Sequence, residues 1–277
     1  MEKPYVISAE LDSATAEYIN KKNLENARES LDADLRAMGK TTQWVSSTDM
    51  RRAIAKSIDT RLPVVSLEES YVDAPDTRLG ISRGVDSSLR DIGYISRSSS
   101  YAPLASQIDQ VARLGNEIQV VDDVVFSGEM LEWLSMELRK RQVTIGRVVC
   151  GIAIQEGINK LEELSIPVQA GVVYDDVDDE ICERDLFITK GSGRKVKGIG
   201  VSALYFDQIY GRPTTWASIP AKDEGWFCVN SLERSLTLLD PSVALSRVGS
   251  FLGYSSDDST QQAIQKRLDQ LQERGEV

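Results

Sequence analysis

The stretch that decides the fold is VVDDVVFSGEML, residues 120–131. Two valines lead into the adjacent carboxylates of Asp122 and Asp123, and two more valines follow before a Phe-Ser-Gly turn and the start of a helix. The run 117–125 is rich in valine and isoleucine, which is typical of a strand buried at the centre of a parallel sheet. Ligands of such sheets bind at the carboxyl ends of the strands, so the two aspartates predict a binding site.

Ser127 and Gly128 lie where this strand turns into the helix. The first backbone N–H groups of a helix attract an anion, and a glycine lets the backbone approach that anion closely. The turn therefore predicts a phosphate cradle, and the aspartates before it suit ribose hydroxyls or a divalent cation. The alternative is ordinary turn chemistry, in which an aspartate caps the next helix.

Strands and helices alternate around this stretch. Strand patterns occupy 62–72, 78–86, 91–100, 117–125, 147–154 and 168–174, and helix patterns occupy 103–115, 128–142 and 159–166. The order strand, helix, strand, helix, strand is the signature of a doubly wound α/β unit. We therefore expect an α/β fold with a parallel sheet flanked by helices.

Other patterns flank this core. We expect a helical N-terminal region over 1–60, the α/β core over 61–200, and a C-terminal extension over 201–277. Helices are predicted over 9–39, 48–58 and the tail from about 241, where Ile264, Leu268 and Leu271 form a narrow apolar stripe. The terminal helices could dock a protein partner, and the sequence is also compatible with a homo-oligomer.

Two further features each have two interpretations. The acidic run DDVDDE (175–180) could bind a cation, but such runs are more often solvated turns. The aromatic residues Tyr205, Phe206, Tyr210 and Trp216 could stack on a base or pack the C-terminal extension onto the sheet.

The composition excludes several classes of function. The 277 residues include no histidine, so His-based triads, imidazole bases and His metal ligands are excluded. A net charge of −11 argues against nucleic-acid binding over the whole surface. The three cysteines form no C-x-x-C pair, so we expect reduced thiols and a cytoplasmic location. The N-terminus lacks the apolar core of a signal peptide, and the sequence contains no run of about 18 apolar residues. We therefore expect no membrane segment.

The stretch 120–131 resembles the phosphoribosyl-pyrophosphate (PRPP) loop of type I phosphoribosyltransferases, and the element order over about 62–175 fits that fold. The resemblance implies a Mg²⁺- and PRPP-dependent enzyme. It gives Asp122 and Asp123 the catalytic contacts with the ribose hydroxyls or the metal. It also implies that Ser127 and Gly128 bind the 5′-phosphate.

Three positions depart from the family pattern. Phe126 and Met130 stand where the family has threonines, so two hydroxyl donors are missing, and Glu129 adds a negative charge beside the phosphate. These three residues still belong to the expected PRPP-binding loop through their backbone. The departures indicate either a divergent enzyme or a protein that binds the ligand without turnover.

The family also carries a loop for the pyrophosphate, and two stretches compete for this role. SLEES (66–70) follows an apolar strand but is acidic, which suits only a magnesium-binding loop. Arg83 lies in a segment, 78–97, that holds four arginines, and guanidinium groups suit phosphate oxygens. The alternative for these arginines is pairing with surface carboxylates. SRSSSY (96–101) stands where the family has a mobile loop over the site, and it could equally be an ordinary surface loop.

The leading hypothesis is a transfer of phosphoribose from PRPP to a base, a nucleotide or a macromolecule. The chain also resembles phosphoribosyltransferase-like proteins of bacterial anti-phage systems, including some encoded beside retrons, which implies a role as a defence effector. A second hypothesis is a non-catalytic PRPP or nucleotide sensor that docks a partner. A third is a nucleoside hydrolase or deoxyribosyltransferase, which would need no pyrophosphate site.

Overall fold

The computed structural model describes residues 2–11, 19, 21–98, 100–189, 192–198, 202–238 and 260–273. The chain divides into two compact units, and each contains more than one segment of the sequence. We call Val45–Ser82 with Tyr94–Val177 the core unit, and Met1–Trp44, Arg83–Gly93 and Asp178–Val277 the terminal unit. No helix in the described part of the chain is long and apolar enough to span a bilayer.

The core unit is built on a five-stranded sheet with the strand order β4-β3-β7-β8-β9. Every neighbouring pair in this sheet is parallel. The strands are β3 (Val64–Ser66), β4 (Thr77–Arg78), β7 (Glu117–Val125), β8 (Thr144–Ile154) and β9 (Val168–Tyr174). The predicted parallel sheet is therefore confirmed, and the stretch that suggested it supplies the central strand.

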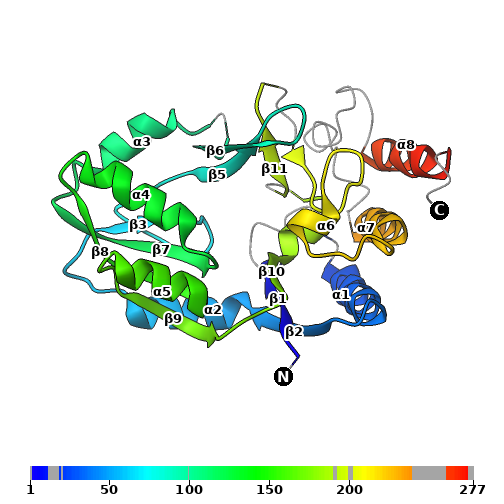
Figure 1. The fold of residues 1–277 in the computed structure, drawn as a ribbon, viewed down its shortest axis with the longest axis horizontal. Coiled ribbons are helices and arrows are strands. Elements are labelled where there is room, and N and C mark those ends of the chain that lie inside the picture. Colours follow the sequence, from blue (N-terminus) through cyan, green and yellow to red (C-terminus); the bar gives the residue numbers. More distant parts are fainter. Residues whose placement is uncertain are drawn as a thin grey trace. The chain divides into compact units, whose positions relative to one another are not determined.

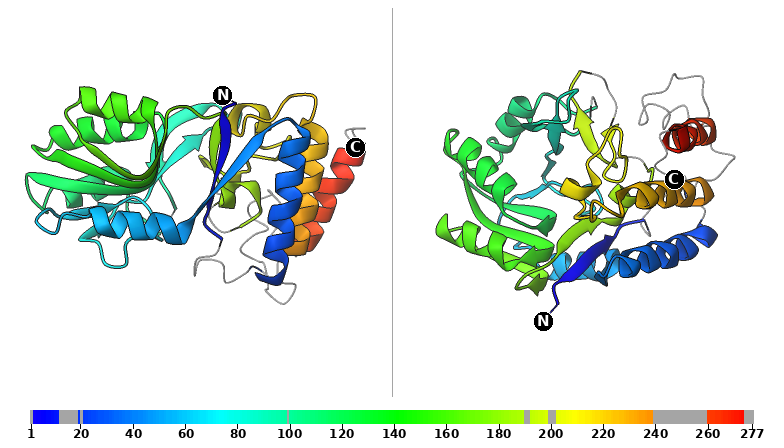
Figure 2. Two further views of the ribbon diagram at one scale, coloured as in Figure 1. Left: turned by 90° about the horizontal axis from the view of Figure 1, so that it is seen from below. Right: turned by 45° about the vertical axis from the view of Figure 1, so that its right-hand side comes forward.

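Helices cover both faces of this sheet (Figures 1 and 2). On one face, α3, α4 and α5 contribute Ile108, Leu134 and Leu161 to a core that also contains Val120 and Val148. On the other face α2 lies so close that a Cβ at Gly151 would meet Met50. The helices are α2 (Ser47–Ser57), α3 (Leu104–Val111), α4 (Glu129–Arg139) and α5 (Gln155–Glu163).

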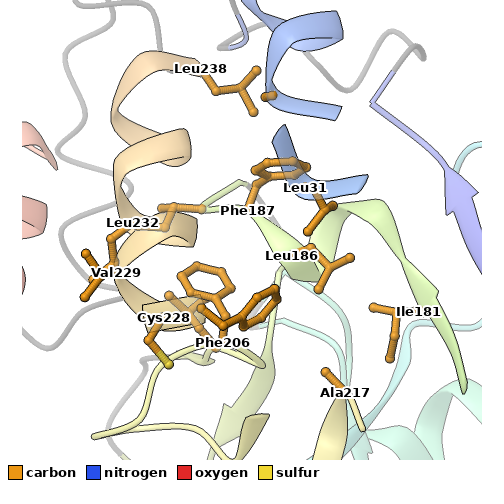
Figure 3. Close-up of a cluster of buried hydrophobic side chains, with 14 of the residues drawn as sticks. Leu31, Ile181, Leu186, Phe187, Phe206, Ala217, Cys228, Val229, Leu232 and Leu238 are labelled. Atoms are coloured by element: carbon orange, nitrogen blue, oxygen red, sulfur yellow. The ribbon is translucent and has the colours of Figure 1, made fainter. Parts of the chain in front are cut away.

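The terminal unit has its own sheet and core. Strands β1 (Pro4–Ala9), β2 (Thr41–Ser46) and β10 (Asp179–Cys182) form a sheet in the order β10-β1-β2, and β1 runs parallel to β10. Helices α1 (Lys21–Ala37), α7 (Glu224–Leu238) and α8 (Thr260–Glu273) lie side by side (Figure 2). Side chains from these elements form one buried apolar cluster, in which Phe187 and Phe206 are fully buried (Figure 3).

Short elements complete the chain. They are the 3-10 helix η1 (Glu183–Leu186), α6 (Pro213–Trp216) and the strands β5 (Ile81–Val85), β6 (Asp91–Ser96), β11 (Arg194–Val196) and β12 (Ser202–Ala203). These four strands form a sheet in the order β12-β11-β5-β6. The chain passes from one unit to the other within β5 and within β6.

The expectation that residues 1–60 are helical is wrong in two places. β1 begins at Pro4, and β2 separates the two helices. β1 pairs with β10, which lies far along the chain, so the local sequence around β1 did not indicate a partner strand. The helices themselves are confirmed as α1 and α2, and Gly39, with φ 83°, follows the end of α1 as expected. Residues 12–18 of the predicted first helix lie outside the described residues.

Two other boundaries differ from the sequence prediction. α5 begins at Gln155, directly after β8, rather than at residue 159. The acidic run 175–180 is not only a turn, because Asp179 and Glu180 belong to β10 and pair with Tyr5 and Val6. Part of that run is therefore the edge strand of a sheet rather than a solvated turn.

The C-terminal aromatic residues mainly pack the terminal unit. Phe206 and Trp216 are buried, and Trp216 lies 5.7 Å from Tyr205 between ring centroids. Tyr210 is 46% exposed and carries the Arg267 guanidinium on its ring. The predicted tail helix is present as α8, where Ile264, Leu268 and Leu271 are buried as expected. Residues 241–259 of that tail lie outside the described part of the chain.

Candidate functional site

Asp122 and Asp123 lie within β7, three and two residues before its end at Val125. β3 pairs with β7 only as far as Val121, so both aspartates lie just beyond the end of β3. Asp122 is 3% exposed and Asp123 is half-buried. The Asp122 side chain accepts a hydrogen bond from the Asp123 amide at 3.1 Å, and the Asp123 side chain accepts one from the Val124 amide at 2.7 Å.

A third carboxylate, from Glu68, joins the two aspartates. Carboxylate oxygens of Glu68, Asp122 and Asp123 all lie within 4.8 Å of one another. Glu68 is 7% exposed, and the Ser66 hydroxyl holds its carbonyl at 2.6 Å. Glu68 belongs to the SLEES stretch, which the sequence suggested as a pyrophosphate loop only if it binds magnesium. A signal was available, because β3 and β7 are parallel and the residues after their carboxyl ends meet at one edge.

Arg97 is the cation paired with this cluster. Its guanidinium binds both carboxylate oxygens of Glu68, one of them at 2.8 Å. The Arg97 side chain also donates to the Ile81 carbonyl at 3.2 Å. One of the four arginines of the segment 78–97 thus lies at the site, but it pairs with a carboxylate.

The cluster carries an excess of negative charge. Burial raises the pKa of Asp122 to about 7, and the neighbouring charge of Glu68 adds to this effect. The contacts with Asp123 and the charge of Arg97 act in the opposite direction. Three carboxylate groups gather here, and oxygen ligands are the ones that Mg²⁺ prefers.

The turn after β7 positions the start of α4. Gly128 precedes the helix with φ 74°, a left-handed conformation that favours glycine, and Ser127 Oγ accepts from the Glu129 amide at 3.5 Å. The first amides of α4 have no partner within the helix, which makes this turn suitable for an anion. This turn and two members of the carboxylate cluster, Asp122 and Asp123, belong to the same strand-turn-helix segment.

The departures from the family pattern have different environments. Phe126 is 36% exposed on the turn, whereas Met130 is half-buried and packs against the apolar core under α4. Glu129 is exposed in the first turn of α4. Of these three residues, Glu129 is the one that adds a charge, and it joins Glu132 in the first turn of α4.

A lysine partly offsets this charge. Lys160 of α5 pairs with Glu132 of α4 at 3.2 Å. This hydrogen bond raises the pKa of Lys160, and the charges of Glu132, Glu129 and Glu156 add to the shift. Glu129 and Glu132 lie in the first turn of α4 and Glu156 in the first turn of α5, so an anion at these helix starts meets several negative side chains.

The remaining predicted residues divide between the units. Arg83 is exposed in β5 and belongs to the terminal unit, whereas Asp122 belongs to the core unit. The segment 96–101 is attached to the acidic loop of the core unit: besides Arg97, the Tyr101 hydroxyl donates to Glu69 at 2.9 Å. Ser99 of that segment lies outside the described residues.

Comparisons with known proteins add little to this geometry. No family model and no curated protein matches the chain. Among solved structures, an orotate phosphoribosyltransferase from Aeropyrum pernix matches at 15% identity. The match covers 54% of this chain and 71% of that chain, with a TM-score of 0.22. A structural match with this TM-score and identity does not establish an activity.

Proposed function

We propose that the core unit carries a Mg²⁺-dependent phosphoribosyl site and that the protein transfers phosphoribose from PRPP to a base, a nucleotide or a macromolecular acceptor. One observation carries the proposal: the carboxylates of Glu68, Asp122 and Asp123 converge on the strand whose next turn opens α4. Carboxylates suit hydroxyls and hard cations, and a helix start suits a phosphate.

Each residue has a stated role in this proposal. Asp123, the more exposed aspartate, holds the ribose hydroxyls, while the Ser127 hydroxyl and the first amides of α4 hold the 5′-phosphate. The nucleophile of the acceptor attacks C1 of the ribose, the bond from C1 to the diphosphate oxygen breaks, and pyrophosphate leaves with the electron pair. Because the chain has no histidine, the proton of the acceptor passes to a carboxylate, a lysine or solvent.

The residues of the cluster fit a magnesium ion. Glu68 and Asp122 are buried oxygen donors, and Asp123 brings a third carboxylate within 4.8 Å of both. When bound, Mg²⁺ would neutralise charge on the diphosphate leaving group. The contact of Arg83 with that diphosphate stays a prediction from the sequence.

A second candidate function is a PRPP or nucleotide sensor without turnover. The observation that favours it is the start of α4, where Glu129 is exposed and Met130 is directed into the core instead of offering a hydroxyl. A loop that lacks these donors can still hold a phosphate through its backbone.

Calorimetry with PRPP, with and without Mg²⁺, tests the proposal. We expect binding that requires Mg²⁺ and is lost in Asp123→Asn, together with pyrophosphate release when an acceptor is present. Binding without pyrophosphate release for any base, nucleotide or nucleic acid offered would favour the sensor. Absence of PRPP binding to the wild-type protein would contradict both.

The resemblance to anti-phage proteins extends the proposal to a cytoplasmic effector. Metabolite profiling of cells that express the protein, with and without phage infection, would identify the acceptor. An accumulation of a phosphoribosylated product in wild-type cells and not in Asp123→Asn cells is the expected result. Equal profiles in the two strains would contradict an effector role.

A further inference from the structure

The turn at 126–128 packs directly against the first turn of α5. A Cβ atom on Gly157 would lie 2.3 Å from the carbonyl oxygen of Phe126 and 3.0 Å from its carbonyl carbon. Both are backbone atoms, so a flexible side chain cannot move away to relieve the clash. Any side chain at position 157 would therefore displace the turn itself.

The contact is reciprocal. A Cβ atom on Gly128 would lie 3.1 Å from the carbonyl oxygen of Gly157 and 3.5 Å from Leu161 Cγ. The two glycines thus allow two backbones to meet, one at the start of α4 and one at the start of α5. This arrangement follows from the sheet order, because β7 and β8 are neighbours and each leads into one of these helices.

We infer that Gly157 is a positioning residue for the anion-binding turn, an inference that rests on the proposed function. The atoms that a Cβ at Gly157 would meet belong to Val125 and Phe126, which lie between the aspartates and Ser127. Because Gly157 has no side chain, the carbonyl of Phe126 can lie against the backbone of α5. This contact sets the position of the turn and the direction of the backbone amides that follow Phe126. A shift of about 1 Å in groups that position a ligand is sufficient to lower activity strongly.

A matched pair of glycine variants tests this role. Gly171 of β9 is the control, because a Cβ there would also meet a backbone oxygen, that of Gly151 at 2.8 Å, and Gly151 belongs to β8 rather than to the turn. The probes are ribose 5-phosphate, which needs the turn, and Mn²⁺, which needs the carboxylates. Both affinities are measured on the full-length chain.

We expect Gly157→Ala to weaken ribose 5-phosphate binding at least tenfold and to change Mn²⁺ affinity less than twofold. Gly171→Ala should lower the melting temperature but leave both affinities within twofold of the wild type. The inference is overturned if Gly157→Ala binds ribose 5-phosphate as the wild type does, or if Gly171→Ala weakens it equally. A wild-type protein that binds Mn²⁺ but not ribose 5-phosphate would instead contradict the proposed function.

Amide resonances of the wild-type protein provide a second test that needs no variant, which covers the case in which Gly157→Ala does not fold. Saturation with ribose 5-phosphate should shift the resonance of Gly157 together with that of Gly128, and leave Gly171 unchanged. A shift of Gly128 without any shift of Gly157 would overturn the inference.

Discussion

Arg97 and Glu68 illustrate what single residues contribute to the candidate site. The sequence predicted Asp122 and Asp123 because they are adjacent in the chain and precede a recognisable turn. It placed Glu68 only in an acidic stretch that could bind magnesium and did not pair Arg97 with it, since Glu68 reaches the aspartates through the pairing of β3 with β7 and Arg97 reaches Glu68 through the return of the chain after β6. Contacts between segments that lie far apart in the chain do not produce a regular spacing of residues in the sequence.

Replacing Arg97 by glutamine should separate its structural role from cation binding. Its loss leaves Glu68 largely buried beside two aspartates, so we expect the free energy of unfolding to fall by about 2 kcal/mol without divalent cations. The increase in melting temperature that Mg²⁺ produces should become larger than in the wild type. Thermal unfolding with and without Mg²⁺ measures both.

The control for Arg97→Gln is Arg90→Gln, which removes an exposed ion pair with Asp86. Exposed pairs contribute little, so this variant should behave as the wild type in both conditions. An Arg97→Gln protein with unchanged stability and an unchanged response to Mg²⁺ would show that the guanidinium does not balance the cluster.

Glu129 should weaken the anion site that it adjoins. Its carboxylate lies in the first turn of α4, where the helix dipole would otherwise favour a phosphate. We expect Glu129→Gln to bind ribose 5-phosphate about two- to fivefold more tightly at low salt, with a smaller gain at high salt. Glu163→Gln, at the far end of α5, is the control and should bind as the wild type does. A gain that does not depend on salt would argue against an electrostatic cause.

At the scale of elements, the sequence predicted buried strands best. The bounds of β7 and β9 match the predicted 117–125 and 168–174, because apolar runs between turn residues mark both ends of such strands. The prediction failed for β1 and β10, which are short and find each other across most of the chain. β10 contains two carboxylates, and its composition resembles a solvated turn.

The acidic composition of β10 predicts a pH dependence of stability. Burial raises the pKa of Glu180 to about 8, and the charges of Asp179, Glu10 and Asp185 add to the shift, while the Ser8 hydroxyl opposes it. A carboxyl group with a raised folded-state pKa stabilises the fold below its unfolded-state pKa and loses that contribution as pH rises through its folded-state value. Stability should therefore decrease between about pH 5 and pH 9.

A Glu180→Gln variant tests this assignment. Since a pKa shift of one unit corresponds to about 1.4 kcal/mol, the variant should be more stable than the wild type by roughly 1–3 kcal/mol at pH 9. The difference should disappear near pH 5. Denaturant unfolding at both pH values measures it, and an equal difference at the two values would contradict the pKa assignment.

At the scale of the whole molecule, the chain forms two units that differ in what stabilises them. The core unit has an apolar core between a parallel sheet and its helices. The terminal unit combines an apolar cluster with buried ion pairs, among them Arg28 with Glu183, whose carboxylate is fully buried. Composition and periodicity predicted the first kind of core. The ion pairs of the second join distant segments, and the sequence alone does not show which charged residues are buried.

Breaking the pair between Arg28 and Glu183 should destabilise the terminal unit. Glu183 accepts from Arg28 at 2.6 and 2.8 Å and from the Leu11 amide at 3.0 Å. We expect Glu183→Gln to lower the free energy of unfolding by about 3 kcal/mol and to increase hydrogen exchange in peptides of that unit. Glu25→Gln, which removes an exposed partner of the same arginine, should cause little change. Similar exchange in the two variants would contradict the assignment.

The central claim is that Glu68, Asp122 and Asp123 together hold a divalent cation. Titration of the full-length protein with Mn²⁺, followed by electron paramagnetic resonance of the free ion, tests it most directly. We predict one tightly bound ion in the wild type, displaced by Mg²⁺, and at least a tenfold loss of affinity in both Glu68→Gln and Asp123→Asn. Wild-type Mn²⁺ affinity in these two variants, or no bound ion in the wild type, would contradict the account.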